Sequence, residues 1–242
     1  MISQNIPTPL KALAIGAHPD DIEFGAGATL AKWGANGCEV SLLICTDGSK
    51  GSWDPSSNPD QLTAVRKTEQ RTSADKLGVS GELVFLDLID GELNAGIEER
   101  DIVASWIRKL RPNVILGHDP WKRYRLHPDH RSAGLLTIEG IIAARDPSFL
   151  PDSKLPPHRP SELFLFEAEE VDHLETCDGN ELKKLDALES HKSQFVSTMG
   201  IEEGSEKQGL EEFRSRIINQ LRSFDGSTDA EMAEGFKRIT EL

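Results

Sequence analysis

Cysteine is scarce in this chain of 242 residues, which contains only three, an odd number without a CxxC spacing. A disulfide framework and a cysteine-based zinc cluster are therefore not expected. We expect Cys38, Cys45 and Cys177 to be reduced thiols in a cytoplasmic protein. Cys38 and Cys45 flank or lie in an apolar run, so we interpret them as small core residues.

Long apolar runs and positive charge are also scarce. No stretch approaches the roughly 18 apolar residues of a transmembrane helix, and residues 1–5 lack the features of a signal peptide. Lys and Arg number 27 against 41 Asp and Glu, which gives a formal net charge of −14. This balance argues against nucleic acid and anionic membrane surfaces as partners. It does not by itself indicate a cationic substrate.

The apolar runs that are present alternate with helical patterns. Strands are expected at 12–16, 40–46, 83–86, 113–117 and 163–167. Helices are expected at 25–33, 63–77, 98–110, 130–145, 180–195 and 211–221, with a weaker one at 228–240. This order predicts an α/β fold, a three-layer α/β/α sandwich with a mostly parallel, Rossmann-like sheet. We expect a single domain over 1–242, with a core at about 11–195 and C-terminal helices at 196–242.

The first polar cluster, Ala-His-Pro-Asp-Asp-Ile-Glu at 17–23, directly follows the first expected strand. Catalytic groups of open parallel sheets gather at the carboxyl ends of strands. His18 and Asp21 are a nitrogen and oxygen donor pair suited to a divalent metal, and Asp20 between them is a candidate base. The alternative is an acidic turn whose aspartates cap the following helix.

The second cluster, His-Pro-Asp-His at 127–130, opens the helix after the fourth expected strand. Proline suits the first helical position, and Asp129 complements the helix dipole. His127 and His130 are spaced i, i+3, so they point to one side of the first turn. Such a pair alone would more readily be an ordinary surface pair. Asp129, two residues after His127, could orient or charge that imidazole.

Two such clusters after two strands favour one joint metal site. Both are expected at the same edge of the sheet, because each follows a strand through a short connection. Ligation by His18, Asp21 and His130 would leave one position open for water, as in hydrolytic zinc sites. His127 would then lie near the metal without binding it.

The chain resembles the LmbE-like, or PIG-L, family of metal-dependent de-N-acetylases, whose motifs are AHPDDxE and HPDH. That family includes deacetylases of N-acetylglucosamine conjugates. The resemblance covers roughly residues 11 to 195. Further landmarks in family order are Thr46-Asp47-Gly48, Arg66 with Glu69, Asp90-Gly91-Glu92-Leu93, Arg111-Pro112 and His191-Lys192-Ser193-Gln194.

The resemblance implies a role for each residue of the two clusters. It implies His18, Asp21 and His130 as ligands of one Zn2+ ion per chain, although such a set also accepts other first-row divalent metals. It implies Asp20 as the general base. It also implies that His127 stabilises the oxyanion or protonates the leaving amine, with Asp129 behind it.

The expected substrate contacts are less direct. Arg66 and Asp90 match positions that contact the sugar in relatives, and a surface ion pair is the alternative. Some family members have a tyrosine two residues before the HPDH motif, where this chain has Arg125 and places Tyr124 one residue earlier. Tyr124 is a substrate-binding candidate, as are the rim-loop tryptophans Trp53 and Trp121, which could stack on a sugar or simply pack.

Together these features predict a zinc-dependent hydrolase that removes an N-acetyl or N-acyl group from an N-acetylglucosamine-type conjugate. A metal-activated water would attack, with an Asp as base. The partner is then a small amino-sugar molecule, and a homo-oligomer stays open. One alternative is a metal phosphoesterase, which would usually have a second metal. Another is a non-catalytic sugar- or metal-binding module, which would not need Asp20.

Overall fold

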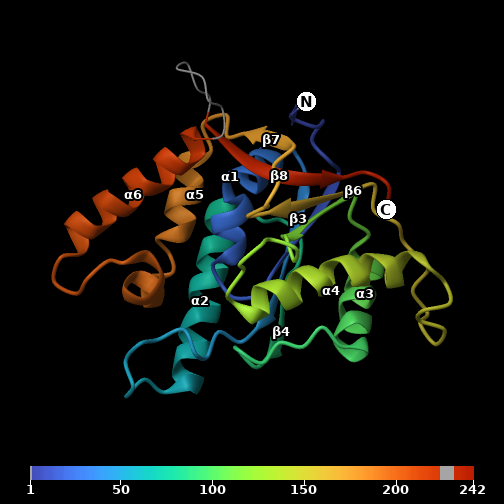
Figure 1. The fold of residues 1–242 in the computed structure, drawn as a ribbon, viewed down its shortest axis with the longest axis horizontal. Helices are drawn as coiled ribbons and strands as arrows, with labels where there is room; N and C mark the ends of the chain where they lie inside the picture. The colour runs from blue at the N-terminus through green and yellow to red at the C-terminus, as the bar shows by residue number, and fades with distance from the viewer. Residues whose placement is uncertain (1, 224–231) are drawn as a thin grey trace.

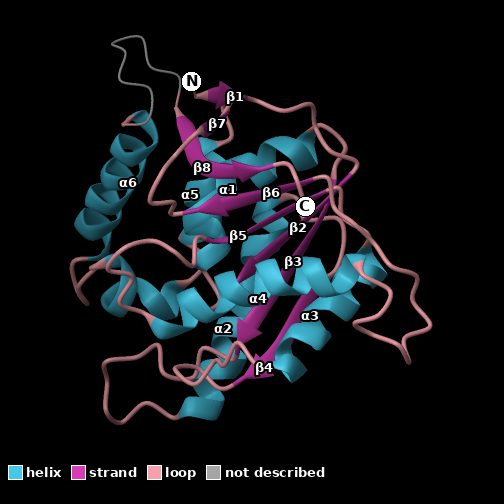
Figure 2. Cartoon of the chain, turned by 45° about the vertical axis from the view of Figure 1, so that its right-hand side comes forward, coloured by secondary structure: helices cyan, strands magenta, loops and turns pink. Residues whose placement is uncertain are grey.

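The computed structural model describes residues 2–223 and 232–242, whose strands form one eight-stranded sheet of order β1-β7-β8-β6-β5-β2-β3-β4 (Figure 2). All neighbouring strands are parallel except β8, which runs antiparallel to β6 and β7. The strands are β1 Ser3–Gln4, β2 Lys11–Gly16, β3 Glu39–Thr46, β4 Leu83–Leu88, β5 Val114–His118, β6 Glu162–Phe166, β7 His173–Thr176 and β8 Ala233–Ile239. The predicted mostly parallel sheet is confirmed.

Helices cover both faces of this sheet and complete three layers (Figure 1). They are α1 Asp21–Ala35, α2 Pro59–Leu77, α3 Ile97–Leu110, α4 Pro128–Arg145, α5 Glu181–Leu188 and α6 Glu206–Arg222. Leu13 and Ile15 of β2 pack in one core cluster with α3 and α4. Ala12 and Ala14, on the opposite face, pack with α1. This double burial explains the continuous apolar run of β2.

The topology brings the two polar clusters together. β2 pairs in parallel with β3 on one side and β5 on the other. The segments that leave their carboxyl ends therefore meet at one edge of the sheet. Residues 17–23 follow β2, and the connection from β5 leads to 127–130 at the start of α4.

The C-terminal region differs from the sequence-based expectation. Of the weak helix predicted at 228–240, residues 228–231 lie outside the described residues, and 233–239 form the strand β8 instead. Ala and Glu favour helix locally, but β6 and β7 both offer backbone partners, and this tertiary pairing prevails. The helix expected at 180–195 ends at Leu188 and is followed by a 3-10 turn at 192–194 and a π-helical turn at 195–199.

Two other expectations can be compared with the structure. The three cysteines are free and buried, as predicted, and Cys38 and Cys45 belong to the core. Within the described ranges, no helix combines the length and apolar character needed to cross a bilayer. The assignment of 1–242 to a single domain stays a prediction.

Glu234 on β8 ties the C-terminal strand to helix α1. The backbone of α1 is non-helical at Ala26, where φ is −148°. Just beyond this kink the carboxylate of Glu234 accepts hydrogen bonds from the backbone N–H groups of Ala28, at 3.1 Å, and Thr29, at 2.8 Å. The same carboxylate lies 2.5 Å from the ammonium of Lys184. Glu234 thus serves as a cap for the second half of α1.

We expect Glu234→Ala to lower the free energy of unfolding by about 3–5 kcal/mol, because it leaves the buried ammonium of Lys184 without its partner. Urea denaturation of the variant measures this change. Glu241→Ala, at an exposed glutamate near the same end of the chain, is the control. Equal unfolding midpoints for the two variants would contradict the structural role of Glu234.

Candidate active site

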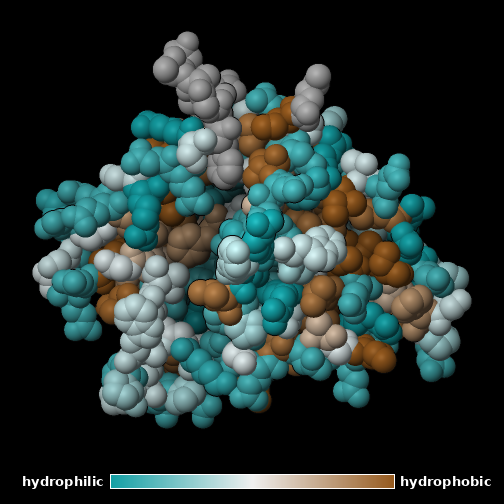
Figure 3. All heavy atoms as spheres, in the orientation of Figure 1, coloured by the Kyte–Doolittle hydropathy of each residue, from teal (hydrophilic) through white to brown (hydrophobic). Residues whose placement is uncertain are grey.

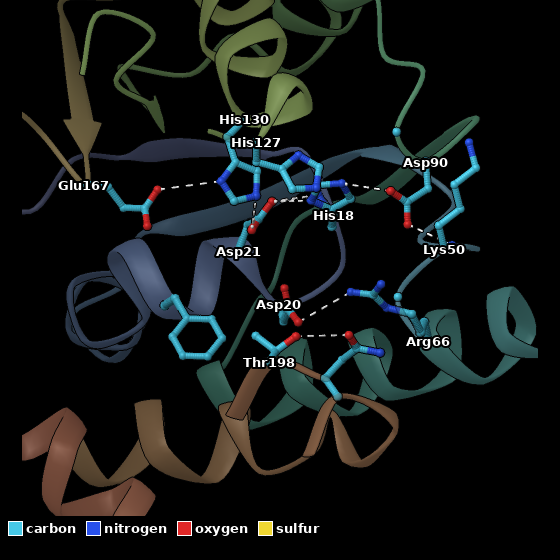
Figure 4. A pocket seen from close by; sticks show the side chains of 14 residues that line it. His18, Asp20, Asp21, Lys50, Arg66, Asp90, His127, His130, Glu167 and Thr198 are labelled. Atoms are coloured by element: carbon cyan, nitrogen blue, oxygen red, sulfur yellow. Dashed lines mark hydrogen bonds and ion pairs between the residues drawn. The ribbon is translucent and has the colours of Figure 1, made fainter. Parts of the chain in front are cut away.

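A cavity of about 590 Å³ opens at the carboxyl edge of the sheet, and both polar clusters contribute to its wall (Figure 4). Its lining comes from the β2–α1 connection and the start of α1, the β3–α2 connection and α2, the β4–α3 connection, the start of α4, the segment after β6 and the turns after α5. The residues are His18, Asp20, Asp21, Phe24, Lys50, Gly51, Arg66, Asp90, Gly91, His127, His130, Glu167, Gln194 and Thr198.

The carboxylate of Asp21 lies between imidazoles. Its Oδ2 is 3.3 Å from His18 Nδ1, and its Oδ1 is 3.2 Å from His130 Nε2. Oδ2 also lies 3.2 Å from His118 Nε2. Burial alone would raise the pKa of Asp21, but the facing rings of His130 and His118 hold it well below its usual range. Asp21 is therefore a carboxylate that is ready to bind a cation.

His118 was not among the predicted site residues. It is the last residue of β5, it is buried, and its ring stacks on that of His130 with centroids 4.4 Å apart. Its Nδ1 faces the carboxylate of Glu167 at 3.2 Å. The rule that placed the two clusters, that polar groups at strand ends form sites, also applies to His118 and could have found it.

The second ring nitrogen of His18 faces two other carboxylates. His18 Nε2 lies 3.2 Å from Asp90 Oδ1 and 3.2 Å from Asp129 Oδ2. Asp129 is fully buried and also accepts hydrogen bonds from the backbone N–H groups of Gly91, at 2.6 Å, and Leu93, at 3.2 Å. The backbone N–H groups hold the Asp129 carboxylate in place, and Asp129 and Asp90 together orient the His18 ring through its Nε2.

Among the hydrogen bonds of the described residues, the Asp129 carboxylate makes none to the His127 ring, and a role of Asp129 in orienting or charging that ring stays a prediction. Residues i and i+2 of a helical turn point in different directions, so the Asp129 side chain turns towards His18. His127 instead serves as the N-cap of α4, and its Nδ1 accepts the backbone N–H of Asp129 at 3.3 Å. The ring proton of His127 then resides on Nε2.

Asp20 is held in an uncommon backbone conformation, with φ of 104°. Its N–H donates to Gln70 Oε1 at 3.0 Å, and its carboxylate lies 3.4 Å from Arg66 Nη2. Burial raises the pKa of Asp20 to about 6, although the Arg66 guanidinium opposes the rise. Strain of this kind in a ligand cavity is typical of functional residues. Figure 4 shows Asp20 beside Arg66 and apart from the imidazoles.

Arg66 and Asp90 are buried, so the alternative of a surface ion pair does not hold. Arg66 donates to the carbonyl of Pro19 at 2.6 Å and that of Gly48 at 3.1 Å. Asp90 accepts the backbone N–H of Lys50 at 3.0 Å. Both residues line the cavity, and their contact with a sugar stays a prediction.

The aromatic candidates lie outside this cavity. Tyr124 is 86% exposed and, like Trp53 and Trp121, does not contribute to the cavity wall. Substrate binding by Tyr124 stays a prediction without support from this geometry.

Three overlapping groups of side chains in the described part of the chain could hold a metal ion. They are His18 with His127 and His130, Asp21 with His118 and His130, and His18 with Asp90 and Asp129. Asp21 is within 3.3 Å of both His18 and His130. Ligands of a tetrahedral zinc ion lie roughly 3.3 Å apart, so each of these two pairs has a suitable spacing, with Asp21 Oδ2 facing His18 and Oδ1 facing His130. The predicted set of His18, Asp21 and His130 is itself not one of the three groups. A bound cation would also neutralise part of the negative charge of the buried carboxylates Asp21, Asp90 and Asp129.

The fold and the site define an α/β sandwich whose imidazoles and carboxylates gather in one cavity at the carboxyl edge of the sheet. The family described as PIG-L: GlcNAc-PI de-N-acetylase matches residues 13–141. The chain is 36% identical over 188 residues to the diacetylchitobiose deacetylase of Thermococcus kodakarensis, covering 76% of this chain and 70% of the relative. The chain belongs to this deacetylase family and is an enzyme.

Two further similarities extend the comparison. The structure of N,N'-diacetylchitobiose deacetylase from Pyrococcus horikoshii superposes with a TM-score of 0.84 at 30% identity, covering 96% of this chain and 84% of that one. The 1D-myo-inositol 2-acetamido-2-deoxy-alpha-D-glucopyranoside deacetylase of Streptomyces avermitilis is 30% identical over 170 residues, which cover 60% of this chain and 58% of that relative.

Proposed function

We propose that the protein is a zinc-dependent deacetylase that removes the N-acetyl group from an N-acetylglucosamine-type conjugate. The observation that carries this proposal is the convergence of the two clusters in one cavity. There Asp21 lies between His18 and His130, and the separate carboxylate of Asp20 faces the same space. The relatives named as deacetylases of acetylated amino sugars support the substrate class.

His18, Asp21 and His130 are the proposed ligands of the metal. When bound, a divalent ion supplies polarisation of the acetyl carbonyl and acidification of a water molecule. Metal-binding histidines usually donate their other ring N–H to a carboxylate. Asp90 and Asp129 stand in that position at His18 Nε2, so we propose that they orient this ligand.

Asp20 and His127 then have complementary roles in moving protons. Asp20 takes a proton from the attacking water, and its raised pKa, about 6, suits a base that works near neutral pH. Burial and the neighbouring His18 lower the pKa of His127, so its ring is neutral and carries its proton on Nε2. From there it can donate a hydrogen bond to the amide oxygen as negative charge develops, while the proton that Asp20 has taken from the water passes to the leaving amine.

The phosphoesterase alternative gains one specific observation. The donor groups include two that share no residue, namely Asp21, His118 and His130 on one side and His18, Asp90 and Asp129 on the other. Two such groups could in principle hold two metals, as phosphoesterases often do. Asp90 and Asp129 could equally well orient His18 as a ligand of a single metal. The number of metal ions per chain therefore distinguishes the phosphoesterase from the deacetylase.

The test is metal content of the purified protein, combined with acetate release from N-acetylglucosamine and N,N'-diacetylchitobiose. We expect about one metal per chain, loss of acetate release after chelation, and recovery with zinc. Two metals with hydrolysis of a phosphate ester would favour the phosphoesterase. Bound metal without hydrolysis of any N-acetyl sugar would favour the non-catalytic binding module.

A further inference from the structure

A second cavity, of about 380 Å³, lies next to the active-site cavity. We infer that it is the subsite for the part of the substrate beyond the N-acetylated sugar, and that it accepts a neutral or cationic pyranose. This inference rests on the proposed function and adds the identity of the group attached to the sugar.

The same two chain segments form the walls of both cavities. In the loop after β3, Lys50 and Gly51 line the active-site cavity, and the next residues, Ser52 and Trp53, line the second one. In the turns after α5, Gln194 and Thr198 line the first, whereas Ser193 and Ser197 line the second. The two cavities are therefore neighbours along both segments, and a substrate that extends past one sugar would reach the second cavity over the border at Gly51 and Ser197.

Hydrogen bonds hold the two walls in place. Ser197 Oγ donates to the carbonyl of Gly51 at 2.9 Å, which connects the walls at the border between the cavities. Glu69 of α2 accepts the N–H of Ser193 at 2.8 Å and its hydroxyl at 2.6 Å. Ser197 belongs to the π-helical turn at 195–199, and turns of this kind are frequent at functional sites. The subsite is thus built before any ligand binds.

Trp53 provides the recognition surface. Its side chain lines the second cavity while the residue remains 75% exposed, which is unusual for so large an apolar ring. An indole presents a flat face with a polar N–H at its edge. The C–H face of a pyranose packs on such a ring, and its hydroxyl groups remain free for polar partners such as Asp54 and Glu202.

The acidic lining of the second cavity limits which chemical groups it can bind. The cavity is lined by Asp54, Glu202, Glu203 and Glu206 against the single cation Lys192. This negative field repels a phosphate-linked group and attracts a protonated amino sugar. In Figure 3 the lower left of the molecule, where these segments lie in Figure 1, is mostly hydrophilic or intermediate in hydropathy, which suits a sugar. A chito-type disaccharide meets these requirements.

Kinetics of Trp53→Ala test the subsite. We expect kcat/KM for N,N'-diacetylchitobiose to fall about three- to tenfold, mainly through KM, while kcat/KM for N-acetylglucosamine stays unchanged. Trp121→Ala is the matched control, since this tryptophan is 62% exposed and lines neither cavity. An equal fall for both substrates, or no fall for the disaccharide, would overturn the inference.

Binding of chitobiose, the fully deacetylated disaccharide, gives a readout that does not depend on hydrolysis. Titration calorimetry should show Kd for chitobiose raised about three- to tenfold by Trp53→Ala, with Kd for glucosamine and the Trp121→Ala control unchanged. If acetate release fails but this pattern holds, the proposed function is wrong and the subsite stands. If acetate is released but chitobiose binds both variants equally, only the subsite is wrong.

Discussion

Asp20→Asn should lower kcat for acetate release by about 10²- to 10⁴-fold while the protein keeps its metal. The amide has nearly the shape of the carboxylate but cannot accept the proton of the attacking water. Metal should be retained because Asp20 belongs to none of the metal-donor groups found in residues 2–223 and 232–242. Kinetics and metal analysis on the same preparation measure both effects.

Asp152→Asn, at an exposed aspartate in the loop after α4, is the matched control and should leave both quantities unchanged. The backbone of Asp20 adds a second check, because its positive φ is one that asparagine tolerates well. A fold defect in Asp20→Asn is therefore not expected. If this variant kept most of its activity, Asp20 would not be the general base.

His130→Ala should lose the metal, with an affinity at least about a hundredfold weaker, and acetate release should fall with it. The side chain supplies one of the two rings nearest to Asp21, and its Nε2 lies 3.2 Å from Asp21 Oδ1. Burial lowers the pKa of His130, but the adjacent Asp21 reverses the effect, so removal of the ring also leaves that carboxylate less compensated. Metal titration by calorimetry or a competing chelator gives the affinity.

His158→Ala is the control, because it removes a histidine that lies outside the active-site cavity. His158 lies in the loop after α4, where its Nε2 contacts the carbonyl of Pro112 at 2.7 Å, and it lines no part of the active-site cavity. This variant should bind metal as the unaltered protein does. Full metal affinity in His130→Ala would instead assign the site to the remaining imidazoles and carboxylates.

The sequence predicted the features that depend on short stretches of chain. The apolar runs of β2, β3 and β5 are continuous because both faces of the sheet are covered. One polar cluster follows β2 directly, and the other follows β5 after a connection. The joint cavity follows from the rule that parallel strands end at one edge. For the same reason the two clusters could be expected to share one cavity before their distances were known, whereas His118 was not named.

Features that depend on distant partners could not be predicted in this way. Residues 233–239 form a strand because β6 and β7 leave room between them, which local propensity does not reveal. The direction of the Asp129 side chain depends on the backbone N–H groups of Gly91 and Leu93, which come from another connection. The exposure of Trp53 likewise depends on how its loop meets the turns after α5.

The position of β8 has a consequence for biosynthesis. This strand follows β6, β7 and α6 in sequence, yet it fills the gap between β6 and β7 in the middle of one half of the sheet. Until β8 has been translated, β6 and β7 each have one edge without a partner strand. Helix α1, which begins with Asp21, also lacks the carboxylate of Glu234 until then. A nascent or prematurely terminated chain therefore exposes strand edges that invite aggregation, and chaperone protection is most valuable just before β8 emerges from the ribosome.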